Sequence, residues 1–204
     1  GLRIGAVGLG TGSVAAYVRP GDRLTFFEID PLVVSISTDP KLFSYTTECA
    51  KGPVDYVIGD ARLTVAKQPA GSFDILLIDA FSSDAVPAHL LTVEAVQEYL
   101  DHLEPDGLLA FHVSNRYFDL APVVGRVGQQ LGLSGLVRTD MPAAAESAAG
   151  HLSSQWVLLA RSPDDLGVVD GHHEWYDVTA AGTAPLWTDS FSDLIGAFRW
   201  SITG

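Results

Sequence analysis

The chain opens on an apolar run and a glycine loop, Ile4-Gly5-Ala6-Val7-Gly8-Leu9-Gly10-Thr11-Gly12. A second apolar run, Phe26-Phe27-Glu28-Ile29-Asp30, brings a carboxylate about 20 residues after the first loop glycine. Glycines let the backbone turn sharply and approach a ligand closely, because no Cβ intervenes. An acid at the end of the second strand is placed to accept both hydroxyls of a ribose. The pattern predicts a nucleotide-binding α/β domain; the alternative is a tight strand–helix turn followed by an ordinary surface glutamate.

Composition and charge narrow the class of protein. The 204 residues are 47% apolar, which is enough for one domain, residues 1–204, with a sizeable core. No apolar run is long enough to span a bilayer and no secretory signal is recognisable, so we expect a soluble chain. The single cysteine, Cys49, excludes an internal disulfide and favours a reduced, cytoplasmic setting. The net charge of −13 disfavours nucleic acid and favours cationic ligands.

The start of the chain suggests a larger parent protein. The sequence does not begin with Met and reaches its first apolar run almost at once. We therefore interpret it as a piece of a longer protein, with the cytosolic domain of a membrane protein as one alternative.

Apolar runs alternate with helical patterns along the chain. Strands are expected at residues 2–7, 23–29, 55–58, 73–78, 108–113, 133–138 and 155–161. Helices are expected at residues 13–18, 61–67, 92–103 and 118–131, with a further helix opening at Pro31. Thr92 is the expected N-cap of its helix, Pro105-Asp106-Gly107 should end that helix, and residues 140–150 should form a mobile loop.

The last two expected strands are joined by a loop rather than a helix. Parallel neighbours need a long crossover, whereas antiparallel neighbours can be joined directly. The order is typical of the Rossmann-like α/β fold of AdoMet-dependent methyltransferases: a mostly parallel seven-stranded sheet with the last strand antiparallel. Ligands of such sheets bind at the carboxyl ends of the strands.

The candidate nucleoside site therefore consists of residues that follow strands. Glu28 would take the ribose hydroxyls, and Asp60 would accept a hydrogen bond from the adenine amino group. The Ala61 backbone N–H would reach a ring nitrogen of the adenine. The loop residues Gly8, Gly10, Thr11 and Gly12 complete the predicted cofactor site.

Two carboxylates, Asp79 and Asp84, lie in the loop that follows the strand at residues 73–78. Two acids at this position suit a cationic amine: one can take a proton from the attacking nitrogen, and the other can hold a distant ammonium. A closing loop would lower the amine pKa by desolvation. The alternative is that both aspartates cap a turn or a helix start.

Several motifs resemble the spermidine synthases, the polyamine aminopropyltransferases, and most closely the branch often fused to a membrane or transporter-like segment. They cover nearly the whole chain: Gly8-Leu9-Gly10-Thr11-Gly12, Glu28-Ile29-Asp30-Pro31, Gly59-Asp60-Ala61-Arg62, Leu77-Ile78-Asp79-Ala80-Phe81-Ser82-Ser83-Asp84, His89-Leu90-Leu91-Thr92, His112-Val113-Ser114-Asn115-Arg116-Tyr117 and Trp187-Thr188-Asp189-Ser190-Phe191-Ser192-Asp193-Leu194.

The resemblance implies transfer of an aminopropyl group from decarboxylated AdoMet to a polyamine, leaving methylthioadenosine. It makes Asp79 the base and Asp84 the amine anchor, while Glu28 and Asp60 hold the nucleoside. No metal is needed for this reaction, and the family pattern makes a homodimer the expected assembly.

The chain departs from the family pattern in four ways. Thr11 stands where spermidine synthases carry an aspartate that grips the donor ammonium, and Ala6 stands where methyltransferases often carry an acid. The small N-terminal β domain of spermidine synthases is missing from this chain. The spacing from Asp79 to Asp84 is two residues longer than usual. These departures affect the prediction of which donor is used more than they affect the predicted nucleoside site.

Other polar residues are weaker candidates. Asn115 and Tyr117 follow the strand at residues 108–113 and are predicted to line the acceptor pocket; a purely structural role is the alternative. Asp189 could fold over the site or could cap a helix starting at Phe191. His112 is expected to be a satisfied core histidine, and the histidines show no helical metal-binding spacing.

Three functions remain open from the sequence. The leading prediction is an aminopropyltransferase, a sulfonium-nucleoside transferase acting on a di- or polyamine. The second is an AdoMet-dependent methyltransferase acting on a small molecule. The third is a non-catalytic nucleoside- or polyamine-binding domain of a membrane protein.

Overall fold

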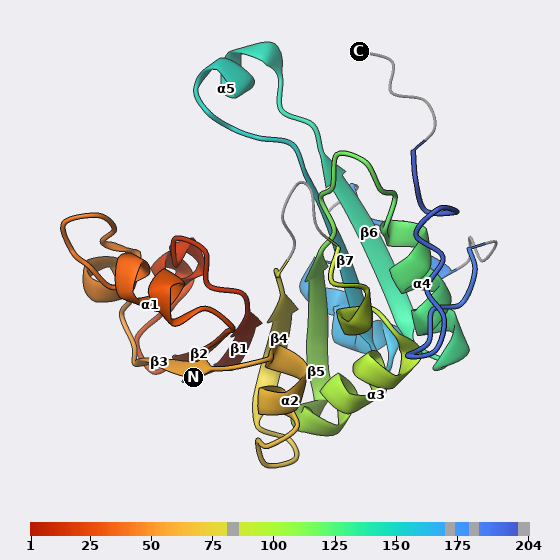
Figure 1. Ribbon diagram of the computed structural model, residues 1–204, viewed down its shortest axis with the longest axis horizontal. Helices are drawn as coiled ribbons and strands as arrows, with labels where there is room; N and C mark the ends of the chain where they lie inside the picture. The colour runs from red at the N-terminus through yellow and green to blue at the C-terminus, as the bar shows by residue number, and fades with distance from the viewer. Residues whose placement is uncertain (81–85, 170–173, 180–183, 200–204) are drawn as a thin grey trace. The chain divides into compact units, whose positions relative to one another are not determined.

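The computed structural model describes residues 1–80, 86–169, 174–179 and 184–199 (Figure 1). The strands are β1 (Arg3–Val7), β2 (Arg23–Glu28), β3 (Val54–Ile58), β4 (Phe73–Ile78), β5 (Leu103–His112), β6 (Ser134–Asp140), β7 (Ser154–Ala160) and β8 (Tyr176–Asp177). The α-helices are α1 (Pro31–Ser37), α2 (Ala61–Val65), α3 (Val93–His102), α4 (Ala121–Gln130) and α5 (Ala144–Ala148). Shorter helical turns are η1 (Ser13–Tyr17), η2 (Tyr45–Cys49), η3 (Ala88–Leu90) and η4 (Pro163–Val169).

The chain folds into two compact units, Gly1–Ala80 with Glu98–Leu109 and Phe81–Gln97 with Ala110–Gly204. In the first unit the hydrogen-bonded strand order is β3-β2-β1-β4-β5, and β5 runs on into the second unit, where the order is β5-β7-β6-β8. β1 is parallel to β2 and β4, β2 is parallel to β3, and β6 is antiparallel to β7.

The predicted α/β fold with an antiparallel final pair is thus confirmed. The structure adds an eighth strand, β8, which pairs antiparallel with β6. Two residues are too few to show the alternating pattern by which a strand is recognised in a sequence.

The strands β1, β2 and β4 form the buried centre of the first unit. Neighbouring residues on each strand are buried together; those at most 1% exposed are Ala6, Val7, Leu24, Phe26, Phe27, Leu76 and Ile78. Successive side chains of a strand point to opposite faces, so burial of neighbours means that both faces of the sheet are covered. The helices α1 and α2 both contact β2. This packing fixes the strand ends from which the candidate nucleoside residues project.

An ionic cluster ties the start of β1 to β4 and β5. The Arg3 guanidinium bonds Asp74 Oδ1 at 2.9 Å and Glu104 Oε1 at 2.6 Å, and the Arg3 backbone N–H donates to Asp74 Oδ2 at 2.6 Å. The hydrogen bonds from the Arg3 side chain hold the pKa of Asp74 below its ordinary value. The folded chain therefore favours the ionised form of this carboxyl group.

We expect Asp74→Asn to lower the stability at pH 7 and to weaken its dependence on acid. Because the folded pKa of Asp74 is depressed, its contribution is fully present above the unfolded pKa of about 3.9 and is lost as the pH falls through the folded value. Urea unfolding at pH 7 and pH 3 measures both effects. An equal loss on acidification in wild type and variant would contradict the assignment; the exposed Asp106→Asn serves as the control.

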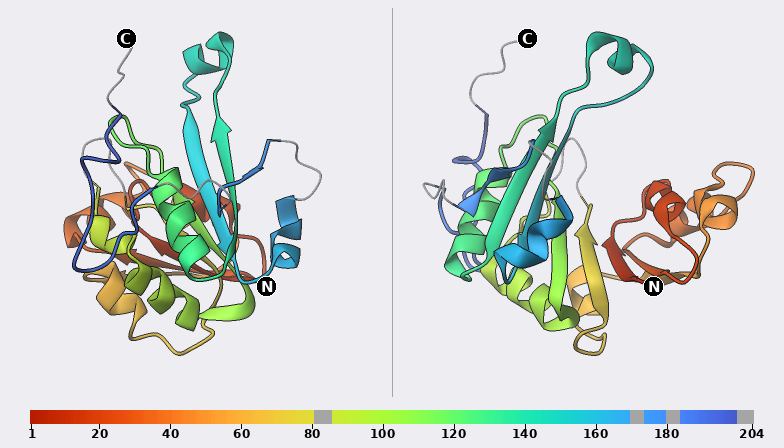
Figure 2. Two further views of the ribbon diagram at one scale, coloured as in Figure 1. Left: turned by 90° about the vertical axis from the view of Figure 1, so that its right-hand side faces the viewer. Right: turned by 180° about the vertical axis from the view of Figure 1, so that it is seen from behind.

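The antiparallel pair β6 and β7 organises the second unit. Their register runs from Ser134↔Ala160 to Asp140↔Ser154. The helix α4 contacts both strands, and Figure 2 shows α5 at the far end of the pair. The segment expected as a loop at residues 140–150 thus contains a short helix.

The junction between α3 and β5 differs from the expected one. Thr92 caps α3 as predicted, since its Oγ1 accepts the Ala95 N–H at 3.2 Å. The helix ends at His102 and β5 begins at Leu103, so Pro105-Asp106-Gly107 lies within the strand rather than between helix and strand. These turn-forming residues therefore do not end α3, which has already ended at His102; β5 runs through them.

None of the helices in the described ranges has the length and apolar character needed to cross a bilayer.

Candidate functional site

The glycine loop after β1 has the predicted backbone geometry. Gly8, Gly10 and Gly12 have φ values of 92°, 52° and 79°, a region that side-chain-bearing residues rarely adopt. A Cβ on Gly8 would collide with the carbonyl oxygen of Asp79, and one on Gly12 would lie 2.6 Å from Thr46 Cγ2. A Cβ on Gly10 would meet no atom of the described residues within 4 Å. The loop is therefore closely packed at both ends and open at its tip, where Thr11 is exposed.

Glu28, the last residue of β2, holds this loop in place. It is 8% exposed; Oε2 accepts the Leu9 N–H and Oε1 accepts the Asp30 N–H, each at 3.0 Å. The carboxylate thus bridges the glycine loop and the start of α1. Each carboxylate oxygen has further lone pairs, so acceptance of ribose hydroxyls is compatible with these bonds.

We expect Glu28→Gln to destabilise the protein by about 1–3 kcal/mol, because the amide NH₂ would face a backbone N–H that now has a carboxylate acceptor. Thermal unfolding without ligand measures this effect. Calorimetric titration with methylthioadenosine then separates a ligand contact from loop support. Unchanged affinity in the folded variant would remove Glu28 from the nucleoside site.

A support residue that the sequence did not reveal is Ser37, at the end of α1. It is 1% exposed, and its hydroxyl donates to the Gly10 carbonyl. The Ser37 carbonyl in turn accepts from Thr46 Oγ1 at 3.3 Å. A serine inside a helical pattern carries no signal in the sequence, since the loop it supports lies 27 residues away.

Asp60 and Ala61 lie where β3 ends and α2 begins. Asp60 is the N-cap of α2: its Oδ1 accepts the Leu63 N–H at 3.1 Å. Both residues are partly exposed at the carboxyl end of the strand. The structure thus gives Asp60 a capping role that the sequence analysis did not predict for it, and its contact with adenine stays a prediction.

A buried phenol lies in the electrostatic environment of Asp60. Burial raises the pKa of Tyr99 well above its ordinary value, and the nearby Arg62 opposes that shift in part. Tyr99 is fully buried, so its hydroxyl stays neutral at physiological pH.

Asp79 directly follows β4, beside the glycine loop. Its backbone N–H donates to the Val7 carbonyl at 2.8 Å, and its own carbonyl lies against Gly8. The residue is partly exposed. The structure thus brings Asp79 to the carboxyl ends of β1 and β4, as the strand order predicts. Asp84 lies outside the described residues.

In the second unit, Asn115 and Tyr117 follow β5. Asn115 is 9% exposed, and its Oδ1 accepts the backbone N–H groups of Tyr117 and Phe118, both at 2.9 Å. This bonding shapes the turn after the strand. Tyr117 is partly exposed, and the Arg116 guanidinium carbon lies 5.7 Å from the centre of its ring.

Asp189 contacts the start of α3. Its Oδ1 accepts the Thr92 hydroxyl at 2.7 Å, and its backbone N–H donates to Glu94 Oε2 at 3.0 Å. The expected alternative of a cap for a helix at Phe191 is wrong, because Thr188 and Phe191 instead exchange two backbone hydrogen bonds. The contacts give Asp189 a clear structural role.

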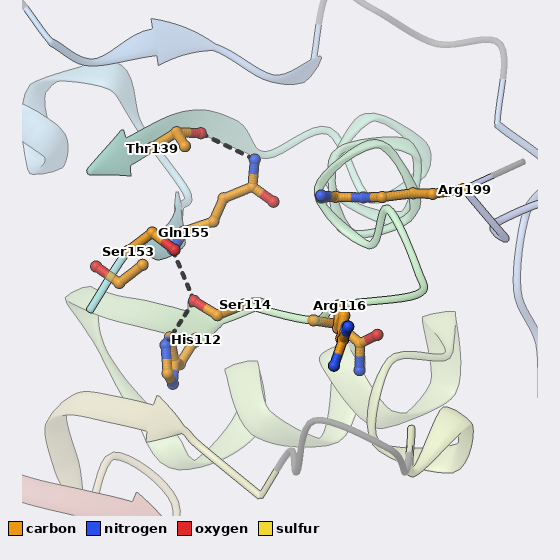
Figure 3. Close-up of a pocket in the computed structure, with 9 residues that line it drawn as sticks. His112, Ser114, Arg116, Thr139, Ser153, Gln155 and Arg199 are labelled. Atoms are coloured by element: carbon orange, nitrogen blue, oxygen red, sulfur yellow. Dashed lines mark hydrogen bonds between the residues drawn. The ribbon is translucent and has the colours of Figure 1, made fainter. Parts of the chain in front are cut away.

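A pocket of about 500 Å³ lies at the end of β5 in the second unit (Figure 3). We call it the arginine–hydroxyl pocket, and it is lined by His112, Ser114, Asn115, Arg116, Thr139, Ser153, Ser154, Gln155 and Arg199. Of the predicted acceptor residues it contains Asn115.

Sequence reasoning missed most of this pocket. The core position expected for His112 is wrong: the side chain lines the pocket, shares a 2.7 Å hydrogen bond between Nε2 and Ser114 Oγ, and stacks on Trp156. Thr139 and Gln155 come together only through the antiparallel register of β6 and β7. The run of polar residues after β5 was the one usable signal.

Comparison with known proteins shows that part of the chain matches a curated protein. The chain matches no protein-family model. It is similar to a protein named polyamine aminopropyltransferase from Vibrio vulnificus strain CMCP6, with 34% identity over 112 residues, or 52% of this chain. The match covers 36% of the relative, so the chain spans about a third of that protein's length.

Solved structures with the same fold include a spermidine synthase and a methyltransferase. A probable spermidine synthase from Corynebacterium glutamicum ATCC 13032 matches with a TM-score of 0.65 and 20% identity, covering 95% of this chain and 74% of that chain. Human methyltransferase-like protein 13, in complex with SAH, matches with a TM-score of 0.57 and 18% identity, covering 93% and 86%. The Rossmann-like fold shared by methyltransferases and spermidine synthases is therefore established, and the predicted resemblance to spermidine synthases is confirmed. The likeness to the membrane-fused branch stays a prediction.

Proposed function

We propose that this protein is an aminopropyltransferase that moves an aminopropyl group from decarboxylated AdoMet to a di- or polyamine, leaving methylthioadenosine. The observation that carries the proposal is the joint between β1 and β4, where Asp79 adjoins Gly8 of the open glycine loop. It brings a carboxylate-bearing residue to the loop at which a nucleoside is expected to bind. The similarity to a polyamine aminopropyltransferase supports the same reaction.

The donor would be held by the first unit. Gly8, Gly10, Thr11 and Gly12 would lie against the sulfonium nucleoside, Glu28 would accept the ribose hydroxyls, and Asp60 with the Ala61 N–H would bind the adenine. The open space above Gly10 and the carboxylate of Glu28 behind the loop support this assignment. Because Glu28 already fixes the loop, the site would need little rearrangement on binding.

The chemistry needs positioning and one proton acceptor. A neutral amine nitrogen attacks the methylene carbon bonded to the sulfonium, and the C–S bond breaks with its electron pair passing to sulfur. The nitrogen's surplus proton then passes to the Asp79 carboxylate. We assign Asp84 as the anchor of a distant ammonium of the acceptor, and Asn115, Tyr117 and Asp189 as further acceptor-binding residues.

A methyltransferase is the second candidate, favoured by one observation. Thr11 is exposed at the tip of the loop, where the resemblance calls for an aspartate that grips the donor ammonium. Without that acid, AdoMet would be a more acceptable donor. The fold shared with a methyltransferase bound to SAH is compatible with this function. A nucleoside- or polyamine-binding domain without turnover is the third candidate.

Domain organisation, location and assembly complete the proposal. We propose that residues 1–204 act as one catalytic domain of a cytoplasmic enzyme that assembles as a homodimer and binds a cationic small molecule. The net charge of −13 supports a cationic ligand and disfavours nucleic acid. Sedimentation analysis of the purified chain tests the assembly.

A product screen by mass spectrometry tests the proposed function. The protein is incubated with decarboxylated AdoMet or AdoMet, each with putrescine, cadaverine or spermidine. Aminopropyl addition with release of methylthioadenosine is the expected result. Methyl addition would instead support the second candidate, and nucleoside binding by calorimetry without any product would support the third.

A further inference from the structure

The arginine–hydroxyl pocket has an unusual charge for this chain. The protein has 25 acidic and 12 basic residues, yet among the described residues the side chains lining this pocket include two arginines and a histidine and no carboxylate. Figure 3 shows Arg116 and Arg199 on one side of the pocket and His112, Ser153 and Thr139 on the other. A pocket of this composition favours an anion.

In the described part of the chain, no carboxylate lies close to either guanidinium group. Within the described part of the chain, Arg199 pairs only with Asp119, at the long distance of 3.7 Å, and 43% of its side chain is exposed. Arg116 is exposed and lies over the Tyr117 ring, with no ion pair to any residue of the described ranges. Neither arginine is neutralised by a close carboxylate from these residues, so both can bind an incoming one.

The opposite side of the pocket is polar, and hydrogen bonds join several of its lining residues. Ser114 Oγ accepts the Gln155 N–H at 2.7 Å and bonds His112 Nε2 at 2.7 Å, and Gln155 Nε2 donates to Thr139 Oγ1 at 2.9 Å. This bonding fixes the Gln155 amide, whose Oε1 is buried without a hydrogen-bond partner among the described residues. A buried acceptor without a partner is costly, so a ligand N–H donor would stabilise it.

The pocket also lies at the edge of the sheet where substrates of such folds bind. Val113 follows β5, and its N–H donates to the Gln155 carbonyl at 2.9 Å; Thr139, near the end of β6, pairs with Gln155. The carboxyl ends of β5 and β6 therefore meet at this pocket, and ligands of open α/β sheets bind at that edge.

We propose that this pocket binds the α-amino acid group of the acceptor, so that the acceptor is a diamino acid rather than a simple diamine. Its carboxylate bonds Arg116 and Arg199, and its α-ammonium donates to Gln155 Oε1. The inference rests on the proposed aminopropyl transfer and names its acceptor class. A simple polyamine would bring only positive charge toward two arginines, which selects against it.

Matched pairs of amines test this inference. Ornithine differs from putrescine, and lysine from cadaverine, by one carboxylate. Calorimetry on the purified protein with methylthioadenosine measures the affinity of each, and mass spectrometry measures aminopropyl addition. The variants are Arg116→Gln and Arg199→Gln, and the control is Arg126→Gln on α4, whose guanidinium bonds Gln129 of its own helix.

We expect wild type and Arg126→Gln to bind ornithine at least about 10-fold more tightly than putrescine, since a charged hydrogen bond of this kind is worth that factor or more. Arg116→Gln and Arg199→Gln should each weaken ornithine binding about 10- to 100-fold. Putrescine, which the arginines repel, should bind each variant at least as tightly as it binds wild type. Thermal unfolding verifies that each variant is folded.

The diamino acid assignment would be overturned if putrescine bound more tightly or reacted faster than ornithine, or if the preference for ornithine survived both substitutions. In either case, aminopropyl addition to putrescine or ornithine would still support the proposed function. Arginine-dependent ornithine binding without aminopropyl addition to any amine would support the pocket's ligand and overturn the proposed function.

Discussion

Asp79→Asn is expected to lower kcat for the proposed transfer by about 10²- to 10⁴-fold, the usual contribution of a general base. Asparagine keeps the size of the side chain and the backbone N–H bond to the Val7 carbonyl, but it cannot take the proton from the attacking amine. The nucleoside contacts are expected on other residues, so methylthioadenosine should bind as tightly as to wild type.

The measurement is single-turnover transfer alongside calorimetry and thermal unfolding. Asp106→Asn, an exposed substitution of the same chemistry, should leave all three unchanged. If Asp79→Asn instead lowers the unfolding temperature and keeps its rate, the residue is structural and its carboxylate takes no part in the reaction.

Gly8→Ala is expected to disrupt the nucleoside site and to destabilise the first unit by about 2–5 kcal/mol, because strain and collision act together. The φ of 92° disfavours any residue with a side chain, and the new Cβ would collide with the Asp79 carbonyl. Since β1 and β4 pair directly up to Val7 and Ile78, the backbone at this end of the loop cannot shift to relieve the collision without breaking that pairing. For a chain of this size the unfolding temperature should fall by roughly 5–20 °C.

Gly10→Ala is the matched control in the same loop. Its φ is also positive, at 52°, but a Cβ there would meet no described atom within 4 Å. We expect only the conformational cost, about 1–2 kcal/mol, and a folded protein. Differential scanning calorimetry compares the two variants. Equal destabilisation would show that backbone strain alone, and not the contact with Asp79, makes glycine necessary at position 8.

The positions of the proposed nucleoside-binding residues could be predicted from the sequence, because these residues end strands of one parallel sheet. Gly8, Glu28, Asp60 and Asp79 each follow or close an apolar run. Parallel strands have their carboxyl ends at the same edge of the sheet. A residue that directly follows a strand in the sequence is therefore predicted to lie at that edge. The structure shows that three of these residues also support the fold, since Glu28 holds the loop, Asp60 caps α2, and the Asp79 backbone bonds β1.

The residues of the second unit that are proposed to bind the acceptor could not be brought together from the sequence in this way. Asp189 reaches Thr92 across 97 positions of sequence, and the arginine–hydroxyl pocket gathers residues from His112 to Arg199. No local pattern signals such a meeting. The β8 strand and the extension of β5 through Pro105 likewise depend on neighbours that become adjacent only after folding.

Local periodicity, glycines and chain order were sufficient to determine the α/β class, the glycine loop and the edge of the sheet at which polar residues would gather, since these depend on residues close together in sequence. Tertiary structure alone decided the charge of the pocket beside Asn115. That charge depends on which side chains the antiparallel register of β6 and β7 and the returning C-terminal segment bring to the end of β5. Side chains that are distant in the sequence share a pocket only after strands far apart in the chain have paired. No short stretch of sequence indicates which strands will pair.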